Sequence, residues 1–254
     1  MRSSGGLFIA GSLVACQVLS EVGPEEVKKD HVGEIGERTT ASAPEGSGVM
    51  AFDGFDGKLR LKWNIVNPDV SHYSLSKERG ALTIATQEGG LSRFSNNCKN
   101  VFIIESPAAA GEDFEITTCL SAFRPVGDWN QAGLVCYNDD DNYLKGVCEW
   151  SFGSMGMGQR VLTLGRETDG HASFQWFAVG LRLDKVWLRL KKQGNRFEFS
   201  TSSDGKSFRR LGSCTWGDGS VKRVGLLAKN GPGSKAPEVD ASFDFFEFRS
   251  LKGD

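Results

Sequence analysis

Short runs of β-branched, aromatic and other apolar residues recur about every ten residues from residue 50 onward. Glycine, asparagine and aspartate separate the runs, and these residues favour tight turns. Evenly spaced short strands of this kind are typical of an antiparallel sandwich or barrel, and no segment favours a helix. The predicted strands lie at residues 59–66, 72–76, 81–86, 101–105, 113–124, 131–137, 142–151, 160–168, 185–192, 195–202, 206–212, 221–229 and 239–250.

Two turn signals define hairpins within this pattern. Apolar and polar residues alternate from 186 to 191, and Gly194-Asn195 then turns the chain into the next run. Asp204-Gly205 predicts a second tight turn soon afterwards. In the last run, Ala241, Phe243 and Phe245 share one parity, which predicts that one face of that strand is buried.

The first sixteen residues predict an export signal. Arg2 precedes an uncharged apolar run from Leu7 to Ala15, which is too short for a membrane-spanning helix of roughly 20 residues. Leu13-Val14-Ala15-Cys16 resembles a bacterial lipobox, in which Cys16 would receive a diacylglycerol thioether and become the new N-terminus. The alternatives are a plain signal peptide cut near Ala15 or a misassigned start codon.

Residues 17–49 predict a flexible acidic tether. Seven acidic and three basic residues lie there, and the segment sustains no period of 2 or 3.6 residues. A flexible coil of 33 residues has its ends roughly 30 Å apart. We therefore expect a signal peptide with a lipobox-like end at 1–16, the tether at 17–49 and the β-sandwich at 50–254.

The charge balance argues against a nucleic-acid partner. The 30 Lys+Arg residues and 32 Asp+Glu residues give a formal net charge of -2, whereas binding by counterion release needs a clustered positive face. Three histidines leave little room for a histidine-rich metal centre, and none of them lies in a serine or cysteine nucleophile motif. We expect no cofactor, and contact with a membrane only through the N-terminal lipid.

Five cysteines lie in the predicted sandwich, at 98, 119, 136, 148 and 214. If the turn between Asn138 and Asn142 centres on Asp140, Cys136 faces Leu144 and Cys148 faces Ala132, so the two cysteines are not cross-strand partners. Small buried thiols are therefore favoured over a disulfide framework, which stays open as the alternative.

The acidic run Asp139-Asp140-Asp141 has the highest density of oxygen ligands in the chain. Calcium prefers six to eight oxygens, but the alternation and distant glutamate of a calcium-binding loop are absent. An exposed hairpin tip is the favoured interpretation, and Asp139 and Asp141 are weak calcium candidates.

No carboxylate pair in the sequence has convincing catalytic spacing. Glycoside hydrolysis uses two carboxylates roughly 5–10 Å apart on one surface. Glu112, Asp113 and Glu115 do not form a same-face ladder, and Glu238 with Asp240 lacks a third partner. We regard both sets as weak candidates and expect that the chain is not an enzyme, although a hydrolase or lyase stays open as an alternative.

Aromatic residues carry the remaining functional signal. Sugar rings stack on exposed indoles, while neighbouring amide and charged groups bind their hydroxyls. Most of the six tryptophans are expected to fill the core. Trp129 and Trp176 are the best candidates for exposure because Gly, Asp, Asn or Gln flanks each of them.

Several segments together resemble one known family across residues 50–251. They are Phe52-Asp53-Gly54-Phe55-Asp56-Gly57 followed by Trp63, Gly80-Ala81-Leu82-Thr83-Ile84, Trp129-Asn130-Gln131-Ala132-Gly133-Leu134, Asn142-Tyr143-Leu144-Lys145, Glu149, and Trp187-Leu188-Arg189-Leu190 leading to Ser203-Asp204-Gly205. The order and spacing resemble the concanavalin A-like β-sandwich that forms the C-terminal domain of family 43 glycoside hydrolases such as β-xylosidases, and its free-standing relatives.

The resemblance implies a two-sheet antiparallel jelly roll that can meet carbohydrate on one face. In the β-xylosidases the catalytic carboxylates belong to a separate domain, for which this chain has no room. By resemblance, Gln131, Tyr143, Lys145 and Glu149 lie on the central hairpin and are candidates for a ligand-facing row. A structural ion pair between Lys145 and Glu149 is an equally open interpretation.

These observations favour an exported, lipid-anchored, non-catalytic β-sandwich that binds a polysaccharide or glycan at the cell envelope. The predicted ligand-binding residues are Trp129, Gln131, Tyr143, Lys145, Glu149 and Trp176. The alternatives are a glycoside hydrolase or lyase on the same fold, and a structural or protein-interaction module without a glycan site.

Overall fold

The computed structural model describes residues 48–92, 95–127, 129–151, 159–178 and 185–251. The predicted signal peptide and nearly all of the predicted tether lie outside these ranges. The described elements are β1 (Val49–Asp53), β2 (Asn64–Val66), the 3-10 helix η1 (Val70–His72), β3 (Tyr73–Ser74), β4 (Leu82–Ala85), β5 (Leu91–Ser92), β6 (Ser95–Asn96), β7 (Val101–Glu105), β8 (Phe114–Phe123), β9 (Gln131–Asp139), β10 (Asn142–Ser151), β11 (Gln159–Thr168), β12 (His171–Ala178), β13 (Val186–Gln193), β14 (Arg196–Ser202), β15 (Arg209–Thr215), β16 (Arg223–Lys229) and β17 (Asp240–Ser250).

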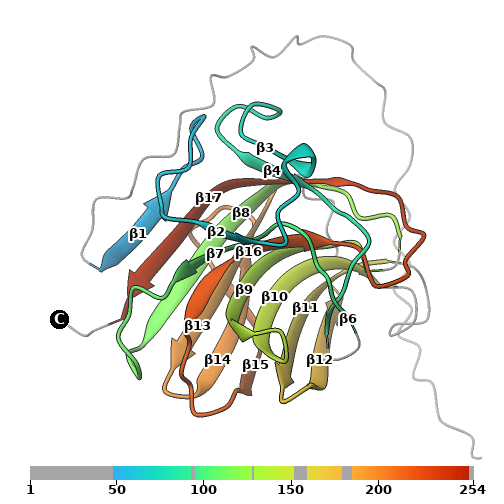
Figure 1. Cartoon of the computed structure of the whole chain (residues 1–254). Coiled ribbons are helices and arrows are strands. Elements are labelled where there is room, and N and C mark those ends of the chain that lie inside the picture. Colours follow the sequence, from blue (N-terminus) through green and yellow to red (C-terminus); the bar gives the residue numbers. More distant parts are fainter. Residues whose placement is uncertain (1–47, 93–94, 128, 152–158, 179–184, 252–254) are drawn as a thin grey trace, which may run out of the picture. The chain divides into compact units, whose positions relative to one another are not determined.

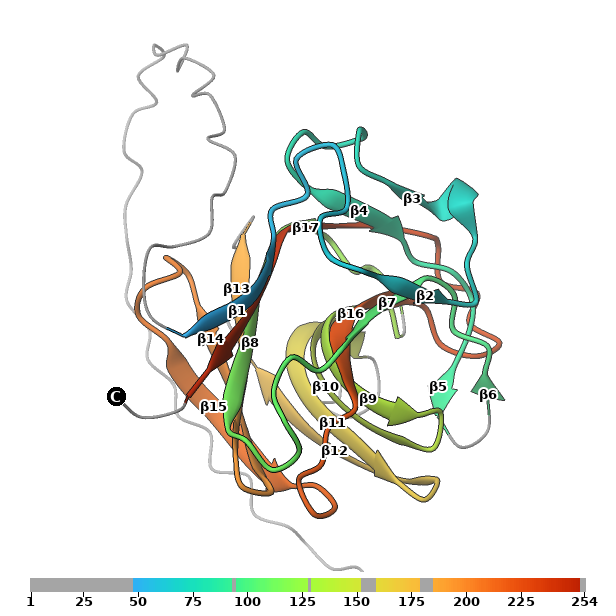
Figure 2. The same cartoon turned by 60° about the vertical axis from the view of Figure 1, so that its left-hand side comes forward.

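Two antiparallel sheets form a sandwich, as the sequence predicts. One sheet has eight strands in the order β15-β14-β13-β8-β17-β4-β3, with β1 also paired to β17. The other has seven strands in the order β12-β11-β10-β9-β16-β7-β2. Figures 1 and 2 show β9 to β12 side by side in one curved layer, with β13, β14 and β15 in the other.

An aromatic-rich core fills the space between the sheets. Period-two alternation places every second residue of a strand on the inner face, and phenylalanine supplies much of the buried volume. The largest buried aromatic side chains of this core are Phe55, Phe102, Phe114, Phe197, Phe199, Phe243, Phe246 and Phe248. Burying a large apolar side chain stabilises the fold by about 1.5–3 kcal/mol, so these residues account for much of the driving force.

The predicted hairpins and cysteine positions are confirmed. β13 and β14 pair so that Gln193 faces Arg196 across the two-residue Gly194-Asn195 turn. In the β9–β10 hairpin, Cys136 faces Leu144 and Cys148 faces Ala132. Cys98, Cys136, Cys148 and Cys214 are free thiols, and all of the sandwich cysteines except Cys214 are buried.

Strand β12 is missing from the sequence prediction. It follows the two-residue Asp169-Gly170 turn and pairs with β11 over eight positions, from Thr168–His171 to Val161–Ala178. It forms the edge of the seven-stranded sheet, and most of its side chains are exposed. An edge strand has no continuous apolar run, because neither face needs to be fully buried.

The predicted strand at 59–66 is shorter in the structure, because a buried carboxylate folds its first half into a turn. Asp53 accepts hydrogen bonds from the backbone N–H groups of Phe55, Arg60 and Leu61, and from the Trp63 indole. The extended segment therefore begins only at Asn64. The expectation of no helix is also wrong for three residues, since Asp69 caps the short helix η1.

The buried parity of the last strand changes partway along it. Ala241 and Phe243 lie in the core as predicted, but β17 shifts register between Phe243 and Phe246. After this β-bulge, Phe246 and Phe248 point into the core. Phe245, which was predicted to share the buried face, is instead half-buried against Phe52, with ring centroids 6.0 Å apart.

A second apolar cluster lies on the outward face of the seven-stranded sheet. It includes Leu91 of β5 and Cys98, which follows β6, together with Val135, Tyr143 and Val147. This outward face is therefore partly covered by the chain itself. No helix within the described ranges is long and apolar enough to cross a membrane.

Candidate functional site

The outward face of the seven-stranded sheet carries a row of polar side chains. Residues of β9 and β10 alternate between the core and this face, so Gln131, Lys145 and Glu149 all point outward. Gln131 lies opposite Glu149 on one side and opposite Lys229 of β16 on the other. Directly opposed residues have Cβ atoms about 4.5–5.5 Å apart. The register of the β9–β10 and β9–β16 pairs therefore places Gln131 next to Glu149 and Lys229.

Hydrogen bonds join this row into one network. Lys145 Nζ donates to Gln131 Oε1 at 3.0 Å, and Gln131 Nε2 donates to Glu149 Oε2. Thr163 Oγ1 and Trp176 Nε1 both donate to Glu149 Oε1, at 2.9 and 3.1 Å. We call Gln131, Lys145, Glu149 and Thr163 the polar row. None of the ion pairs among the described residues includes Lys145. The Gln131 amide therefore links Lys145 to Glu149 through two hydrogen bonds, in place of a direct ion pair.

Two exposed aromatic rings stand beside the polar row. Gln131, Lys145 and Glu149 are only 5%, 3% and 3% exposed, whereas Trp176 is 40% and Phe174 is 37% exposed. The Phe174 and Trp176 ring centroids are 5.8 Å apart. Lys145 Nζ lies 5.8 Å from the Phe174 centroid, within cation–π range. The predicted exposure of Trp176 is confirmed, and its indole is fixed by the bond to Glu149.

Tyr143 belongs to the same face of the sheet, but other residues cover its side chain. It is fully buried, and its hydroxyl lies within hydrogen-bond distance of Leu91 O and, at 3.0 Å, of Glu167 Oε2. A phenol has one hydrogen to donate, so it satisfies one of these acceptors at a time. Burial and the adjacent Glu167 raise the pKa of Tyr143 well above its usual range, which keeps the phenol neutral. The structure places Tyr143 within the apolar cluster and not at the exposed surface.

Trp129 is the second exposed indole, with 49% of its side chain accessible. It has a positive φ of 61°, and its backbone N–H donates to Trp150 O at 3.2 Å. Its ring lies against Gly231, where an added Cβ would come within 2.2 Å of Trp129 Cε3. Trp129 comes just before β9, which lies three strands from β12 and Trp176 in the sheet order.

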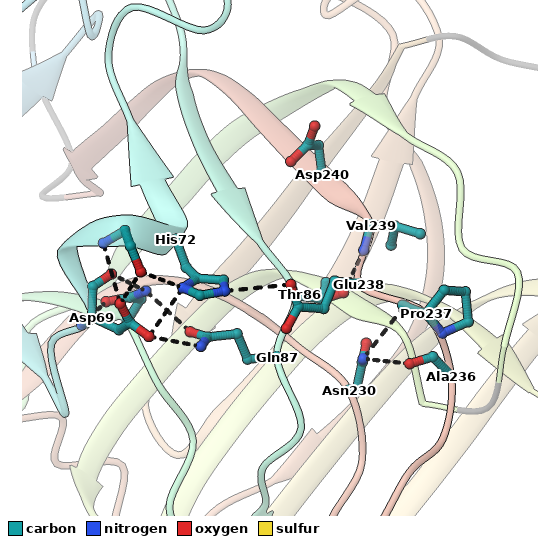
Figure 3. A network of polar contacts seen from close by, with 12 residues as sticks. Asp69, His72, Thr86, Gln87, Asn230, Ala236, Pro237, Glu238, Val239 and Asp240 are labelled. Carbon is teal, nitrogen blue, oxygen red and sulfur yellow. Dashed lines mark hydrogen bonds and ion pairs between the residues drawn. The ribbon is translucent and has the colours of Figure 1, made fainter.

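A polar network holds residues 230–239, the segment that contains Gly231 and so contacts the Trp129 ring (Figure 3). His72 lies between two acids, with Nδ1 3.0 Å from Asp69 Oδ2 and Nε2 3.4 Å from Glu238 Oε2. Nearby, Asn230 Nδ2 donates to Ala236 O at 3.1 Å. The Val239 N–H donates to Thr86 Oγ1 at 2.9 Å. The segment containing Gly231 is thus fixed from both ends.

The polar row includes an unusually perturbed lysine. Burial and the nearby charge of Lys229 together lower the pKa of Lys145 to about 7, while the charge of Glu149 acts against both. Burial also lowers the pKa of Lys229. An ammonium group loses hydration when it is buried, so its neutral form is favoured.

The weaker sequence candidates lie away from this face. Glu115 lies on β8 of the eight-stranded sheet, near Arg189 of β13 and Arg249 of β17. Glu238 contacts His72, and Asp240 pairs with Lys77 at 2.6 Å. These acids therefore belong to different parts of the fold from the polar row.

The acidic run forms a hairpin tip. Asp139 Oδ1 accepts hydrogen bonds from the Asp141 N–H at 3.0 Å and from Asn142 Nδ2 at 2.9 Å. Asp140 accepts a hydrogen bond from Tyr137. In the part of the chain that the structure describes, no group of three or more His, Cys, Asp or Glu side chains is placed to hold a metal ion.

Four residues of this face are absent from the sequence prediction: Thr163, Glu167, Phe174 and Lys229. Thr163 and Glu167 lie on β11, where nothing in the local pattern distinguishes their roles. Phe174 has the same parity as Trp176, and the Asp169-Gly170 turn before them was a usable signal for β12. Lys229 joins the site only through the pairing of β16 with β9.

Comparisons with known proteins agree with this architecture. A family model described as the beta xylosidase C-terminal concanavalin A-like domain matches residues 52–249. No match was found among the curated proteins compared.

Several solved structures share the fold. The GH43 protein BlXynB from Bacillus licheniformis is 24% identical, with a TM-score of 0.65 over 79% of this chain and 39% of that chain. A xylan beta-1,4-xylosidase from Bacillus halodurans C-125 is 18% identical, with a TM-score of 0.64 over 85% of this chain and 41% of that chain. A Bacillus licheniformis beta-glucanase is 12% identical, with a TM-score of 0.52 over 81% of this chain and 99% of that chain.

The chain therefore spans about two fifths of the length of the first two proteins. The family match covers most of the sandwich, and the fold agrees with it. The resemblance expected from the sequence is confirmed, and the chain belongs to the family of beta xylosidase C-terminal concanavalin A-like domains.

Proposed function

We propose that this chain is a non-catalytic carbohydrate-binding sandwich, exported and held at the cell envelope by lipid on Cys16. The observation that carries the binding proposal is the exposed Trp176 indole, hydrogen-bonded to Glu149 beside the polar row. An indole fixed in one orientation offers a flat apolar face for a sugar ring without losing much conformational entropy on binding.

The spacing of the two indoles favours an extended ligand. Three strand spacings separate β12 from β9, and neighbouring strands lie about 4.8 Å apart. The span of about 14 Å is wider than one pyranose ring, so it suits a chain of sugars. One fold relative is a xylan beta-1,4-xylosidase, which makes xylan the first polysaccharide to test.

The hydrogen bonding of Glu149 favours binding over hydrolysis. A hydrolase needs two carboxylates that can reach the scissile bond, one of them able to exchange a proton. Both oxygens of Glu149 already accept hydrogen bonds from protein donors. Glu167 is fully buried beside Tyr143. Release of reducing sugar that a Glu149→Gln change abolishes would replace this proposal with the hydrolase alternative.

Replacing Trp176 with alanine should weaken glycan binding about tenfold or more, because a buried aromatic contact at a binding centre contributes about 2 kcal/mol. Trp176→Phe should retain part of the affinity, since it keeps a ring but loses the N–H donor to Glu149. Isothermal titration with xylo-oligosaccharides, after a screen of plant, algal and microbial glycans, measures both effects.

Phe208→Ala is the matched control for this experiment. Phe208 is a partly exposed aromatic in the connection between β14 and β15 of the other sheet, with the Arg189 guanidinium 3.6 Å from its ring centroid. Its replacement should leave glycan affinity unchanged. An intact protein that binds none of the glycans, or a Trp176→Ala variant that binds as well as the parent, would rule out this binding face.

The anchoring part of the proposal rests on Leu13-Val14-Ala15-Cys16, which lies outside the described residues. In a bacterial host, Cys16→Ala should move the protein from the membrane fraction to the soluble fraction and abolish labelling by a fatty-acid probe. Two or three acyl chains hold a protein firmly, at about 0.8 kcal/mol per buried CH₂. Cys214→Ala serves as the control. Unlabelled parent protein in the soluble fraction would instead support simple cleavage near Ala15.

A further inference from the structure

Two buried lysines lie on strands that pair with the strand of Gln131. Lys145 Nζ lies 3.0 Å from Gln131 Oε1, and Lys229 lies directly opposite Gln131 in the neighbouring strand. Lys145 is 3% exposed and Lys229 is 4% exposed. Lysine is almost never buried to this degree without a charged partner.

Both ammonium groups have unused hydrogen-bond donors. An ammonium carries three N–H groups. Within the described ranges, the hydrogen-bond acceptors of these lysines are Gln131 Oε1 for Lys145 and Asn230 O for Lys229, the latter at 2.9 Å. Both acceptors are neutral, and no ion pair among the described residues includes either lysine. The face therefore offers several N–H donors of positive groups without a matching carboxylate.

The carboxylates near these two cations accept hydrogen bonds from other donors. Glu149 and Glu167 are the carboxylates whose charge acts on Lys145, and Cys98 is the nearby thiol. Glu149 already accepts three hydrogen bonds from Gln131, Thr163 and Trp176. Glu167 lies near Tyr143, further along the strand. Lys145 also lies 5.4 Å from the centroid of the Tyr143 ring.

We propose that this face selects glycans that carry carboxylate groups, such as uronic acid units, with the sugar carboxylate bound by Lys145 and Lys229. This inference rests on the proposed function. A carboxylate has two oxygens and about four acceptor sites, which matches the unused donors of two ammonium groups. Electrostatic attraction is stronger in a buried setting than in water, so one carboxylate should distinguish otherwise identical oligosaccharides.

The pKa of Lys145, lowered to about 7 by burial and by Lys229, gives this selectivity a pH signature. A sugar carboxylate has a pKa of about 3.5 and stays ionised throughout the range of interest. Below pH 7 the Lys145 ammonium is present, and above pH 7 the free protein loses it. Binding of an acidic glycan should therefore weaken as the pH rises from 6 to 8.5, while binding of a neutral glycan should not.

The experiment compares two probes on the full chain by isothermal titration. The acidic probe is a xylo-oligosaccharide with one glucuronic acid substituent, and the neutral probe is the same compound after reduction of its carboxyl group. We expect at least tenfold tighter binding of the acidic probe at pH 6, a ratio that falls toward one by pH 8.5. Near pH 7.5, binding of the acidic probe should be accompanied by proton uptake, because the bound carboxylate favours the ammonium form of Lys145. The measured binding enthalpy should therefore differ between phosphate and Tris buffers.

Lys145→Met and Lys229→Met test the assignment of the two residues. Each should reduce the preference for the acidic probe at pH 6, measured as the ratio of the affinities for the two probes. Methionine keeps an unbranched apolar side chain and removes a charge that is costly to bury, so both variants should fold. Lys206→Met, at an exposed position, is the matched control and should keep the full preference.

Equal affinity of the parent protein for both probes at pH 6 would overturn the inference and leave the proposed function intact. Binding of neither probe nor any other glycan would overturn the proposed function itself. Acetate that competes as well as the acidic probe at equal concentration would overturn selection of a glycan and indicate a general carboxylate site. If a methionine variant does not fold, the pH profile of the parent protein still decides the question.

Discussion

Replacing Phe246 with alanine should lower the free energy of unfolding by about 3–5 kcal/mol, whereas Phe245→Ala should lower it by about 1 kcal/mol. Phe246 is fully buried, and its ring lies edge-on to Trp63 with centroids 5.3 Å apart. Its removal would leave a cavity inside the sandwich. Phe245 is half-buried and makes a stacked contact with Phe52 outside the core.

Urea unfolding followed by tryptophan fluorescence and by circular dichroism measures both values. The two residues are neighbours of identical chemistry, so each variant serves as the matched control for the other. A larger loss for Phe245→Ala than for Phe246→Ala would mean that the strand keeps its simple alternation, and that the bulge in β17 is absent in solution.

Phe245 and Phe246 show what the alternation of apolar and polar residues cannot predict. Alternation of Ala241 and Phe243 correctly predicts the start of β17, because one face of the strand is buried. The bulge that follows depends on a contact with another strand: Thr118 Oγ1 of β8 donates to Phe245 O at 2.6 Å. Nothing in the local sequence distinguishes a run with such a bulge from one without it.

The fold class was predictable because the turns are encoded locally. Gly194-Asn195 and the Asn138–Asn142 turn define their hairpins directly, and the facing pairs around Cys136 and Cys148 follow from the turn position. Strand β12 was not predicted, because an exposed edge strand is only weakly patterned.

The candidate site was predictable only in part. Gln131, Lys145 and Glu149 were found through the family resemblance, and the structure places them in one network. Lys229 comes from a strand far away in sequence, so its place beside Gln131 is a property of the sheet order. The burial of Tyr143 under Leu91 likewise depends on packing of a distant segment.

Glu149→Gln should lower the free energy of unfolding by about 2 kcal/mol, since it creates a buried donor without an acceptor. If the new amide oxygen keeps its bonds to Thr163 and Trp176, its nitrogen faces Gln131 Nε2, which is also a donor. Rotating the Gln131 amide does not solve the problem, because its nitrogen then faces the Lys145 ammonium. Urea unfolding measures the loss. Glu198→Gln, at a partly exposed ion pair with Arg210, should have a much smaller effect.

The exchanged variant Glu149→Gln with Gln131→Glu should recover most of that stability. Every hydrogen bond of the network then has a donor and an acceptor: Lys145 and the new glutamine donate to the carboxylate at position 131, while Thr163 and Trp176 donate to the amide oxygen at position 149. Gln131→Glu alone places two carboxylates opposite each other and should also be destabilising. The double-mutant cycle should therefore give a coupling of more than about 2 kcal/mol. Losses that simply add would mean that Gln131 and Glu149 do not contact each other, and that the polar row is not a single network.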